Sequence, residues 1–404
     1  MRYNNFLVDN NIEYSYEDLL IGLNLNSRYY PSSVFPLLFD FLSNLLQALV
    51  NNLDITLLDS DFSDSELKQL GILQLTSKKV AFNAVKLKNK EDLIKRVKIS
   101  KSIISIFTSG TTGLPQRVTH TINSLTRMVR TGDRHLNKIW ALAYNSSHIA
   151  GVQVFLQALL NGNTIVNIYN NSTQQSDLLL DKYQVTHISA TPTFYRMLVS
   201  SKKVQTTVER CTLGGEKSDK KILNKVEKKF PKAKLNNIYA STEFGSILVS
   251  KNDAFSIPEE IKSLVKIKKN QLIIHSSLIA DNEFISDEWY STGDIVEFID
   301  KKNKLFRITG RISEIINIGG YNVNPIEVEE SILSLNYIES VRVYGRDNSV
   351  MGKILCADIK SDIQIEVPEI RKILASKLQP FKIPRIIKQV GDICLTRTGK
   401  TKRN

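Results

Sequence analysis

The sequence predicts an α/β protein in which a large N-terminal domain of layered sheets and helices, with a barrel-like subdomain, precedes a small mobile α+β domain. Three observations support this fold class. The chain has 404 residues, which is roughly two to three times the usual domain length. Apolar residues make up 42% and charged residues 24% of it, as in proteins with a substantial core. Strand-like and helix-like segments alternate through the first three quarters of the chain.

The alternation begins with short β-branched runs that are typical of buried strands. These are Ser102–Phe107, Asn163–Tyr169, Val185–Pro192 and Lys234–Ser241. Segments with apolar residues at helical spacing lie between them, including 151–160 and 219–230. Such an alternation predicts a largely parallel sheet covered by helices.

The pattern changes at Gln271, where strands follow one another closely: QLIIHSSL, DIVEFID and KLFRITGR. This spacing predicts an antiparallel or barrel-like subdomain. After Arg311, expected strands (SVRVYGR, KILCADIK and PRIIKQV) accompany expected helices at 326–335 and 368–378. We therefore expect a domain of residues 1–310 and a smaller one of residues 311–404.

Two features bear on where the protein works. No apolar stretch is long enough to span a bilayer, and the first residues, MRYNNFLVDNNIEYSYEDLL, are acidic and polar where a secretory signal is basic and then apolar. The three cysteines, Cys211, Cys356 and Cys394, are far apart and form no C-x-x-C pair. We expect a cytoplasmic protein without a disulfide framework or a zinc site.

The chain is basic, with 54 Lys and Arg against 41 Asp and Glu and a formal net charge of +13. A positive excess attracts polyanions such as nucleotides, nucleic acid, coenzyme A and acidic carrier proteins. Much of it comes from scattered lysines, which a solvated surface also explains. No aromatic RNA-binding motif or helix-turn-helix signal is present, so nucleic acid is not an expected partner.

The segment FTSGTTGLPQRV follows an apolar strand directly and is rich in small hydroxyl residues and glycine. Hydroxyl and backbone N–H donors in such a loop can hold phosphate oxygens. No G-K-[ST] follows at the spacing that a P-loop requires, so this is not the P-loop of ordinary nucleotide triphosphatases. Alone, a run of this composition is also compatible with a plain turn.

Further motifs follow it in a fixed order: YNSSHIAG, LGGE, IYASTEFG, STGD, GRISEIINIGGYNVNPIEVEE, LQPFKIPR and TRTGKTKRN. This set resembles the adenylate-forming (AMP-binding) superfamily of acyl-CoA and aryl-CoA ligases, nonribosomal adenylation domains and luciferases. Only about a hundred residues precede the first motif, so by comparison with the family we expect a reduced N-terminal subdomain. The chain is similar to short members such as o-succinylbenzoate-CoA ligases and, more distantly, the acyl-activating enzymes of polysaccharide gene clusters.

The resemblance implies an AMP-forming acid–thiol ligase. In this family a carboxylate attacks the α-phosphorus of Mg²⁺-bound ATP to give an acyl-adenylate, and a thiol then displaces AMP. The expected substrates are a carboxylic acid, ATP and coenzyme A, with Mg²⁺ as cofactor. An acyl carrier protein is the alternative acceptor, and a member that binds ATP without turnover is a further possibility.

The resemblance also implies roles for individual residues at the nucleotide. Gly214, Gly215 and Glu216 resemble the turn that flanks the adenine pocket, and Tyr239 resembles the residue that stacks near the base. Gln116 and Arg117 replace the usual Lys-Gly pair, so no catalytic role is carried over to Gln116. The loop expected around the β- and γ-phosphates comprises Thr108, Ser109, Gly110, Thr111, Thr112 and Gly113.

Four residues resemble the family's ligands to Mg²⁺, phosphate and ribose. Thr242 matches the hydroxyl that contacts phosphate and Glu243 the carboxylate that binds Mg²⁺. Asp294 resembles the acceptor of both ribose hydroxyls, and Arg311 the arginine that reaches ribose and phosphate. Ser313 stands at the position of the hinge between the two half-reactions.

Two further residues complete the predicted active site. Lys400 matches the lysine that bridges the substrate carboxylate and the α-phosphate. His148 stands where the family has an aromatic residue or histidine lining the acid pocket, although a structural histidine bonded to backbone is an equal alternative. Residues 145–150 offer no aspartate for an ammonium group, which favours a fatty, hydroxy or aryl acid.

Overall fold

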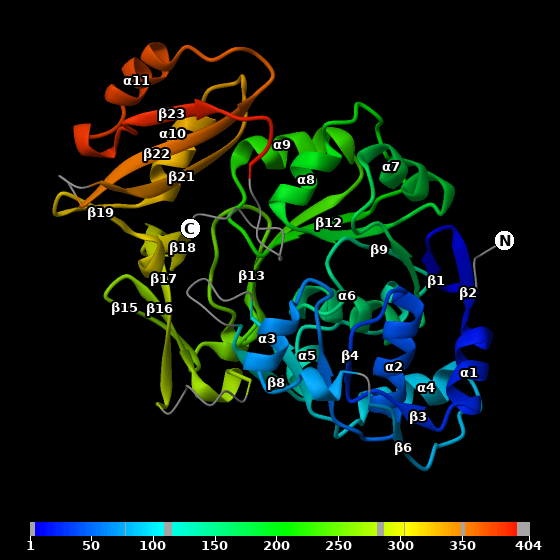
Figure 1. Ribbon diagram of the computed structural model, residues 1–404. Coiled ribbons are helices and arrows are strands. Elements are labelled where there is room, and N and C mark those ends of the chain that lie inside the picture. Colours follow the sequence, from blue (N-terminus) through cyan, green and yellow to red (C-terminus); the bar gives the residue numbers. More distant parts are fainter. Residues whose placement is uncertain are drawn as a thin grey trace. The chain divides into compact units, whose positions relative to one another are not determined.

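The computed structural model describes residues 5–76, 78–108, 115–280, 287–302, 304–348 and 352–393. The chain divides into two compact units, drawn in Figure 1. The first comprises Met1–Asn252 and Ser276–Ser286, and the second Asp253–His275 and Asp287–Asn404. The domain boundary between residues 310 and 311 stays a prediction.

The first unit is built on an eight-stranded sheet with the order β14-β13-β12-β11-β9-β10-β1-β2. Neighbours from β13 to β1 run parallel, and β14 and β2 are antiparallel edge strands. The predicted parallel sheet is therefore confirmed. Its strands are β1 (Asn5–Asp9), β2 (Ile12–Ser15), β9 (Ile139–Leu142), β10 (Thr164–Asn167), β11 (His187–Ala190), β12 (Arg210–Gly214), β13 (Lys234–Ser241) and β14 (Gly245–Ser250).

Helices cover both faces of this sheet, because consecutive strand residues point to opposite sides. Leu7 and Ile165 belong to one apolar cluster, whereas their chain neighbours Val8 and Val166 belong to another. The first cluster includes α2 (Leu38–Val50), α5 (Ile122–Thr126) and α6 (Ile149–Leu159). The second includes α7 (Thr173–Lys182), α8 (Pro192–Leu198) and α9 (Lys220–Lys229).

A smaller sheet in the same unit has the order β4-β5-β7-β8. Its strands β5 (Ile55–Leu57) and β7 (Ile104–Phe107) run parallel, and β8 (Arg117–His120) is antiparallel to β7. The remaining elements of the unit surround these sheets. They are β3 (Arg28–Tyr29), β6 (Val80–Ala81), α1 (Tyr16–Leu25), α3 (Asp64–Gln69) and α4 (Lys90–Lys98). Strand β4 (Ser32–Ser33) belongs to the smaller sheet, where it runs parallel to β5.

The second unit contains the predicted antiparallel segments and the predicted α+β segments. A four-stranded antiparallel sheet is formed by β15 (Val265–Lys268), β16 (Gln271–His275), β17 (Trp289–Asp300) and β18 (Leu305–Arg311). Apolar residues of α10 and α11 then pack on a three-stranded sheet. These elements are β19 (Ile316–Ile318), β20 (Tyr321–Val323), α10 (Pro325–Leu333), β21 (Ile338–Asn348), β22 (Gly352–Ser361), α11 (Val367–Ala375) and β23 (Ile386–Gln389).

Local chemistry accounts for the bounds of several elements. The expected strand 185–192 ends at Ala190, because the Thr191 side chain caps α8 by accepting from Phe194 N and Pro192 occupies the first turn. Asp219 likewise caps α9 by accepting from Ile222 N, so this helix begins at Lys220. The predicted helix 219–230 thus includes its own cap.

Cys211 and Cys356 are buried free thiols, and burial raises the pKa of Cys211 to about 12, which makes it inert. Cys394 lies outside the described residues. Within the described ranges, no helix combines the length and the apolar character that crossing a bilayer requires.

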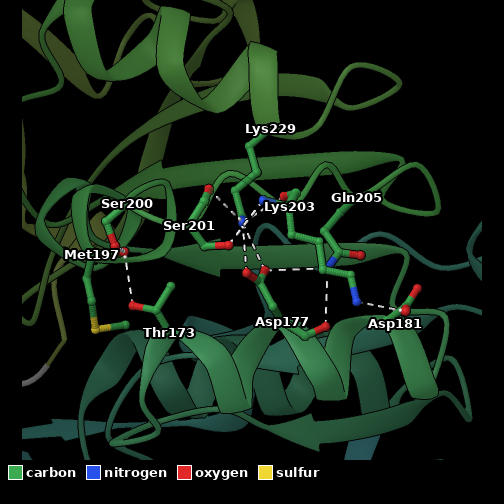
Figure 2. A network of polar contacts seen from close by, with 9 residues as sticks. All are labelled: Thr173, Asp177, Asp181, Met197, Ser200, Ser201, Lys203, Gln205 and Lys229. Atoms are coloured by element: carbon green, nitrogen blue, oxygen red, sulfur yellow. Dashed lines mark hydrogen bonds and ion pairs between the residues drawn. The ribbon is translucent and has the colours of Figure 1, made fainter.

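A buried ion pair ties α7, α9 and the segment after α8 together (Figure 2). The Lys229 Nζ lies 2.9 Å from Asp177 Oδ1, and the two side chains are only 3% and 5% exposed. Lys229 also donates to the Lys203 carbonyl over 2.9 Å, and Gln205 Nε2 donates to Asp177 Oδ1 over 3.4 Å. Each buried charge therefore has several partners, which such groups need to be tolerated.

This network yields a stability prediction. The Lys229→Met substitution leaves the Asp177 carboxylate buried without its cation, so we expect the free energy of unfolding to fall by about 3–5 kcal/mol. The control is Lys203→Met, whose ion pair with Asp181 is 42% and 55% exposed and which should cost only about 0–1 kcal/mol. Chemical denaturation of both variants measures the difference. Equal losses would contradict the role given to burial.

Candidate active site

Polar residues follow the carboxyl ends of neighbouring parallel strands in the first unit. His148 follows β9, Thr193 follows β11, Glu216 follows β12, and Thr242 and Glu243 follow β13. Because β9, β11, β12 and β13 run parallel, these residues leave the sheet at one edge. Open α/β sheets bind ligands at the carboxyl ends of their strands. This edge is therefore the candidate active site.

The turn between β13 and β14 carries Thr242 and Glu243, and its backbone requires a glycine. Gly245 has φ +67°, and a Cβ there would lie 2.8 Å from Gln153 Nε2. Ser246 Oγ donates to Gln153 Oε1 over 3.1 Å, and Gln153 Nε2 donates to the Leu125 carbonyl over 3.3 Å. Gln153 thus holds the start of β14 against α6 and α5.

The Glu243 side chain is half-buried. No described residue donates a hydrogen bond to its carboxylate, while its backbone N–H donates to Ser241 Oγ over 3.2 Å. With the neighbouring Thr242 hydroxyl, it supplies the hard oxygen atoms that Mg²⁺ prefers. Nearby, the Tyr239 ring lies 5.6 Å from the buried Phe244 ring, at an interplanar angle of 35°. The predicted base-stacking residue and the predicted metal ligand therefore come together at the end of β13.

The Glu216 carboxylate has a structural partner that the sequence did not reveal. Its Oε2 accepts from Thr193 N over 3.0 Å and from Thr193 Oγ1 over 2.7 Å. An anion at the first turn of α8 satisfies a free N–H and favours the helix dipole. Gly214, the last residue of β12, pairs with Ile238 of β13, and Gly215 follows with φ +84°. The adenine-flanking role of Gly215 and Glu216 stays a prediction.

His148 forms a hydrogen bond with Asp59, which follows β5 of the smaller sheet. The His148 Nε2 lies 2.7 Å from Asp59 Oδ2, and the two side chains are 17% and 4% exposed. Asp59 Oδ1 accepts from Asn145 Nδ2 over 3.0 Å and from Asp61 N over 3.1 Å. The His148 ring is therefore bonded to another side chain and not only to backbone, and this pair joins the two sheets.

These donors keep the Asp59 carboxylate ionised. Burial raises its pKa, but the hydrogen bond and charge of His148, together with the other donors, outweigh burial and leave the pKa below its ordinary value. Since an ionised carboxylate only accepts, His148 Nε2 carries a proton. Sequence reasoning missed Asp59. The signal available was an aspartate that directly follows the apolar run ITLL at the end of a buried strand.

Thr108 closes the base of the predicted phosphate loop. Its N–H donates to the Gln116 carbonyl over 2.9 Å, and its Oγ1 accepts from Gln116 N over 3.2 Å. Gln116 therefore contributes its backbone N–H and carbonyl to the base of the loop. Ser109, Gly110, Thr111, Thr112, Gly113 and Lys400 lie outside the described residues.

The second unit brings Asp294 and Arg311 together. They sit opposite each other on β17 and β18, and Arg311 Nε lies 3.3 Å from Asp294 Oδ1. Arg311 Nη2 also donates to the Thr292 carbonyl over 3.3 Å. The Asp294 side chain is 14% exposed and that of Arg311 38%. Their predicted contacts with ribose and phosphate stay predictions.

Comparison with known families decides what kind of protein carries this arrangement. The model of the AMP-binding enzyme family matches residues 46–267, which is more than half of the chain. The chain belongs to the AMP-binding enzyme family. A second family model, the AMP-binding enzyme C-terminal domain, matches residues 327–400.

Individual relatives agree with this assignment. The 2-succinylbenzoate–CoA ligase of Staphylococcus epidermidis is 26% identical over 333 residues, covering 75% of this chain and 69% of the relative. The enzyme of the same name from Listeria monocytogenes is 24% identical over 331 residues, covering 76% and 70%.

Solved structures show the same fold. The o-succinylbenzoate CoA synthetase MenE from Bacillus subtilis, in complex with the acyl-adenylate intermediate OSB-AMP, aligns with a TM-score of 0.70 and 16% identity over 99% of this chain and 94% of that one. The amide bond synthetase McbA from Marinactinospora thermotolerans aligns with a TM-score of 0.74 and 14% identity over 98% and 95%.

The predicted family and fold are therefore confirmed. The predicted activity is also confirmed at the level of the family: an AMP-forming acid–CoA ligase that uses ATP, Mg²⁺ and coenzyme A.

The pair of Asp59 and His148 yields a second prediction. In Asp59→Asn the side-chain amide N–H faces His148 Nε2, so the imidazole proton moves to Nδ1. If His148 lines the acid pocket, kcat/KM for the acid should fall 10- to 100-fold. Removing an orienting carboxylate has about this effect elsewhere. Asp61→Asn is the matched control, because Asp61 contributes its backbone N–H to Asp59. Steady-state kinetics with varied acid, plus thermal unfolding, measure both. Equal kinetics for the two variants would contradict the orienting role.

Proposed function

We propose that this enzyme activates a fatty, hydroxy or aryl acid in the first unit and then transfers the acyl group to coenzyme A. The observation that carries this proposal is the turn after β13. It carries the half-buried Thr242 and Glu243 next to Phe244, whose ring contacts that of Tyr239, at the edge where parallel strands end. The proposed first step joins a carboxylate oxygen to the α-phosphorus of ATP and releases pyrophosphate. In the proposed second step, the thiol sulfur attacks the acyl carbon and AMP leaves.

The chain's own residues would orient the reactants and offset their charge. Thr242 contacts phosphate, and Glu243 holds Mg²⁺, which neutralises negative charge on the phosphate oxygens. Tyr239 supports the base by stacking. Asp294 and Arg311 are assigned to ribose and phosphate from their motifs. Accurate placement and electrostatic stabilisation account for most of the acceleration in phosphoryl and nucleotidyl chemistry.

The nature of the acid follows from the charges near His148. Asp59 is the carboxylate closest to it, and each of its oxygens already accepts from a protein donor. The Asp59 side chain is also only 4% exposed, which supports a role in orienting His148 over a role in binding an ammonium group. Residues 145–150 contain no carboxylate. Both facts support an acid without a free amino group.

Pyrophosphate exchange tests this proposal directly. Wild-type protein with Mg²⁺, ATP and labelled pyrophosphate should exchange label with at least one acid from a panel of short and long fatty acids, hydroxy acids, benzoates and 2-succinylbenzoate, and with no amino acid. Glu243→Gln should reduce the exchange rate about 10²- to 10³-fold, as loss of one charge-stabilising group does elsewhere. Exchange supported only by amino acids, or unaffected by Glu243→Gln, would contradict it.

Lys400 is proposed as the cation between the substrate carboxylate and the α-phosphate. Lys400→Ala should therefore reduce adenylation by two orders of magnitude or more, because the charge developing between two anions loses its ammonium. Transfer from preformed acyl-adenylate to coenzyme A should remain within a few-fold of wild type. Lys402→Ala removes the same charge two residues away and serves as the control. Equal loss of both half-reactions in Lys400→Ala would contradict this role.

The acceptor is proposed to be coenzyme A, with a phosphopantetheine carrier protein as the alternative. Both present anionic groups to a basic protein. Parallel assays with coenzyme A and with a holo-carrier protein separate them, and thioester formed only on the carrier would overturn the choice. A cytoplasmic location stays a prediction.

A further inference from the structure

Three consecutive backbone carbonyls of the turn after β13 are each bonded by a group from another segment. The Thr242 carbonyl lies 2.8 Å from His120 Nε2. The Glu243 carbonyl accepts from Ala280 N over 2.6 Å. The Phe244 carbonyl accepts from Arg127 Nη1 over 3.4 Å. A turn held in this way has little freedom to change its backbone angles.

The first contact fixes the protonation of His120. A carbonyl oxygen only accepts, so Nε2 must carry the proton that it donates to Thr242. Burial lowers the pKa of His120 to about 4, which keeps the ring neutral near pH 7. The other ring nitrogen, Nδ1, lies 3.1 Å from Ser124 Oγ. Both ring nitrogens thus have partners, and the imidazole is held in one orientation while 2% exposed.

The contacts of Arg127 extend the same support. Its Nη1 donates to the Leu278 carbonyl over 2.9 Å as well as to Phe244. The guanidinium therefore links the turn to the 276–280 segment, which also supplies the Ala280 N–H. His120 is the last residue of β8, and Arg127 directly follows α5. One short stretch of chain, immediately after the hydroxyl-rich segment in sequence, thus supplies two of the three groups that bond the carbonyls of the turn.

We propose that His120 and Arg127 are positioning residues, which fix the Thr242–Glu243 turn so that its hydroxyl and carboxylate are already placed for Mg²⁺-bound nucleotide. Neither residue is assigned a contact with substrate. This inference rests on the proposed roles of Thr242 and Glu243. A rigid backbone matters there because a displacement of about 1 Å in a catalytic group can cost about 10²-fold in rate.

Variants of His120 separate this role from general packing. In His120→Gln the side-chain amide can still donate to the Thr242 carbonyl, in His120→Asn it is too short to reach it, and in His120→Leu the donor is lost. His187 offers a matched control. It is a buried histidine whose pKa burial lowers to about 4, and its Nδ1 lies 2.9 Å from Thr186 Oγ1, at the other end of β11 from the site.

The readouts are the Kd of α,β-methylene-ATP as a function of Mg²⁺ concentration, measured by calorimetry, and pyrophosphate exchange. We expect His120→Leu and His120→Asn to weaken Mg²⁺-dependent nucleotide binding about 10- to 100-fold, with a higher Mg²⁺ requirement, and His120→Gln to stay within about threefold of wild type. His187→Leu and His187→Gln should leave both readouts unchanged. His120→Asn retains a polar side chain and carries the test where His120→Leu fails to fold.

Two results would overturn the inference: His120→Asn binding the nucleotide as tightly as wild type, or His120→Gln losing as much as His120→Asn. A wild-type protein that binds the nucleotide but exchanges no pyrophosphate with any acid would instead contradict the proposed function. The nucleotide Kd would still test the positioning role in that case.

Discussion

The structure of the first unit depends on the common direction of the strands from β13 to β1. Parallel strands require long connections, and the helices in these connections bury both faces of the sheet. The carboxyl ends then share one edge, where the chain leaves the sheet and continues into turns and loops. His148, Glu216 and Thr242 lie at this edge for that reason. The fold thus supplies the position, and the individual side chains supply the chemistry.

Buried polar groups near this edge are satisfied in pairs that join distant parts of the chain. Asp59 and His148 connect the two sheets, Glu216 and Thr193 connect β12 to α8, and His120 connects β8 to the turn after β13. A buried polar group without a partner costs roughly 1–3 kcal/mol. Such pairs therefore stabilise the fold and determine at the same time how the candidate active site is arranged. Lys229 and Asp177 follow the same rule away from the edge, where the pair only joins helices (Figure 2).

The tight turn at Gly245 shows how a short motif acquires its meaning. In sequence, TEFG is a polar pair, an aromatic residue and a glycine. In the structure, Phe244 is buried under Tyr239, and Gly245 takes a left-handed conformation against Gln153. The apolar and glycine positions anchor the turn, which leaves Thr242 and Glu243 half-buried. The spacing between anchor and polar pair is what makes the motif specific.

Sequence alone determined the fold class, the positions of several strands and helices and the family, because these depend on local periodicity and on a long series of motifs in fixed order. The strand Lys234–Ser241 was predicted to the residue. Sequence reasoning could not identify Asp59 or His120 as residues of the site. Asp59 acquires its role through contact with a residue 89 positions away, and His120 through contact with a residue 122 positions away. Nor did sequence reasoning show that the Glu216 carboxylate caps a helix. Such contacts arise only when the strands align at one edge, because the requirement to pair buried polar groups acts across the folded chain and not along it.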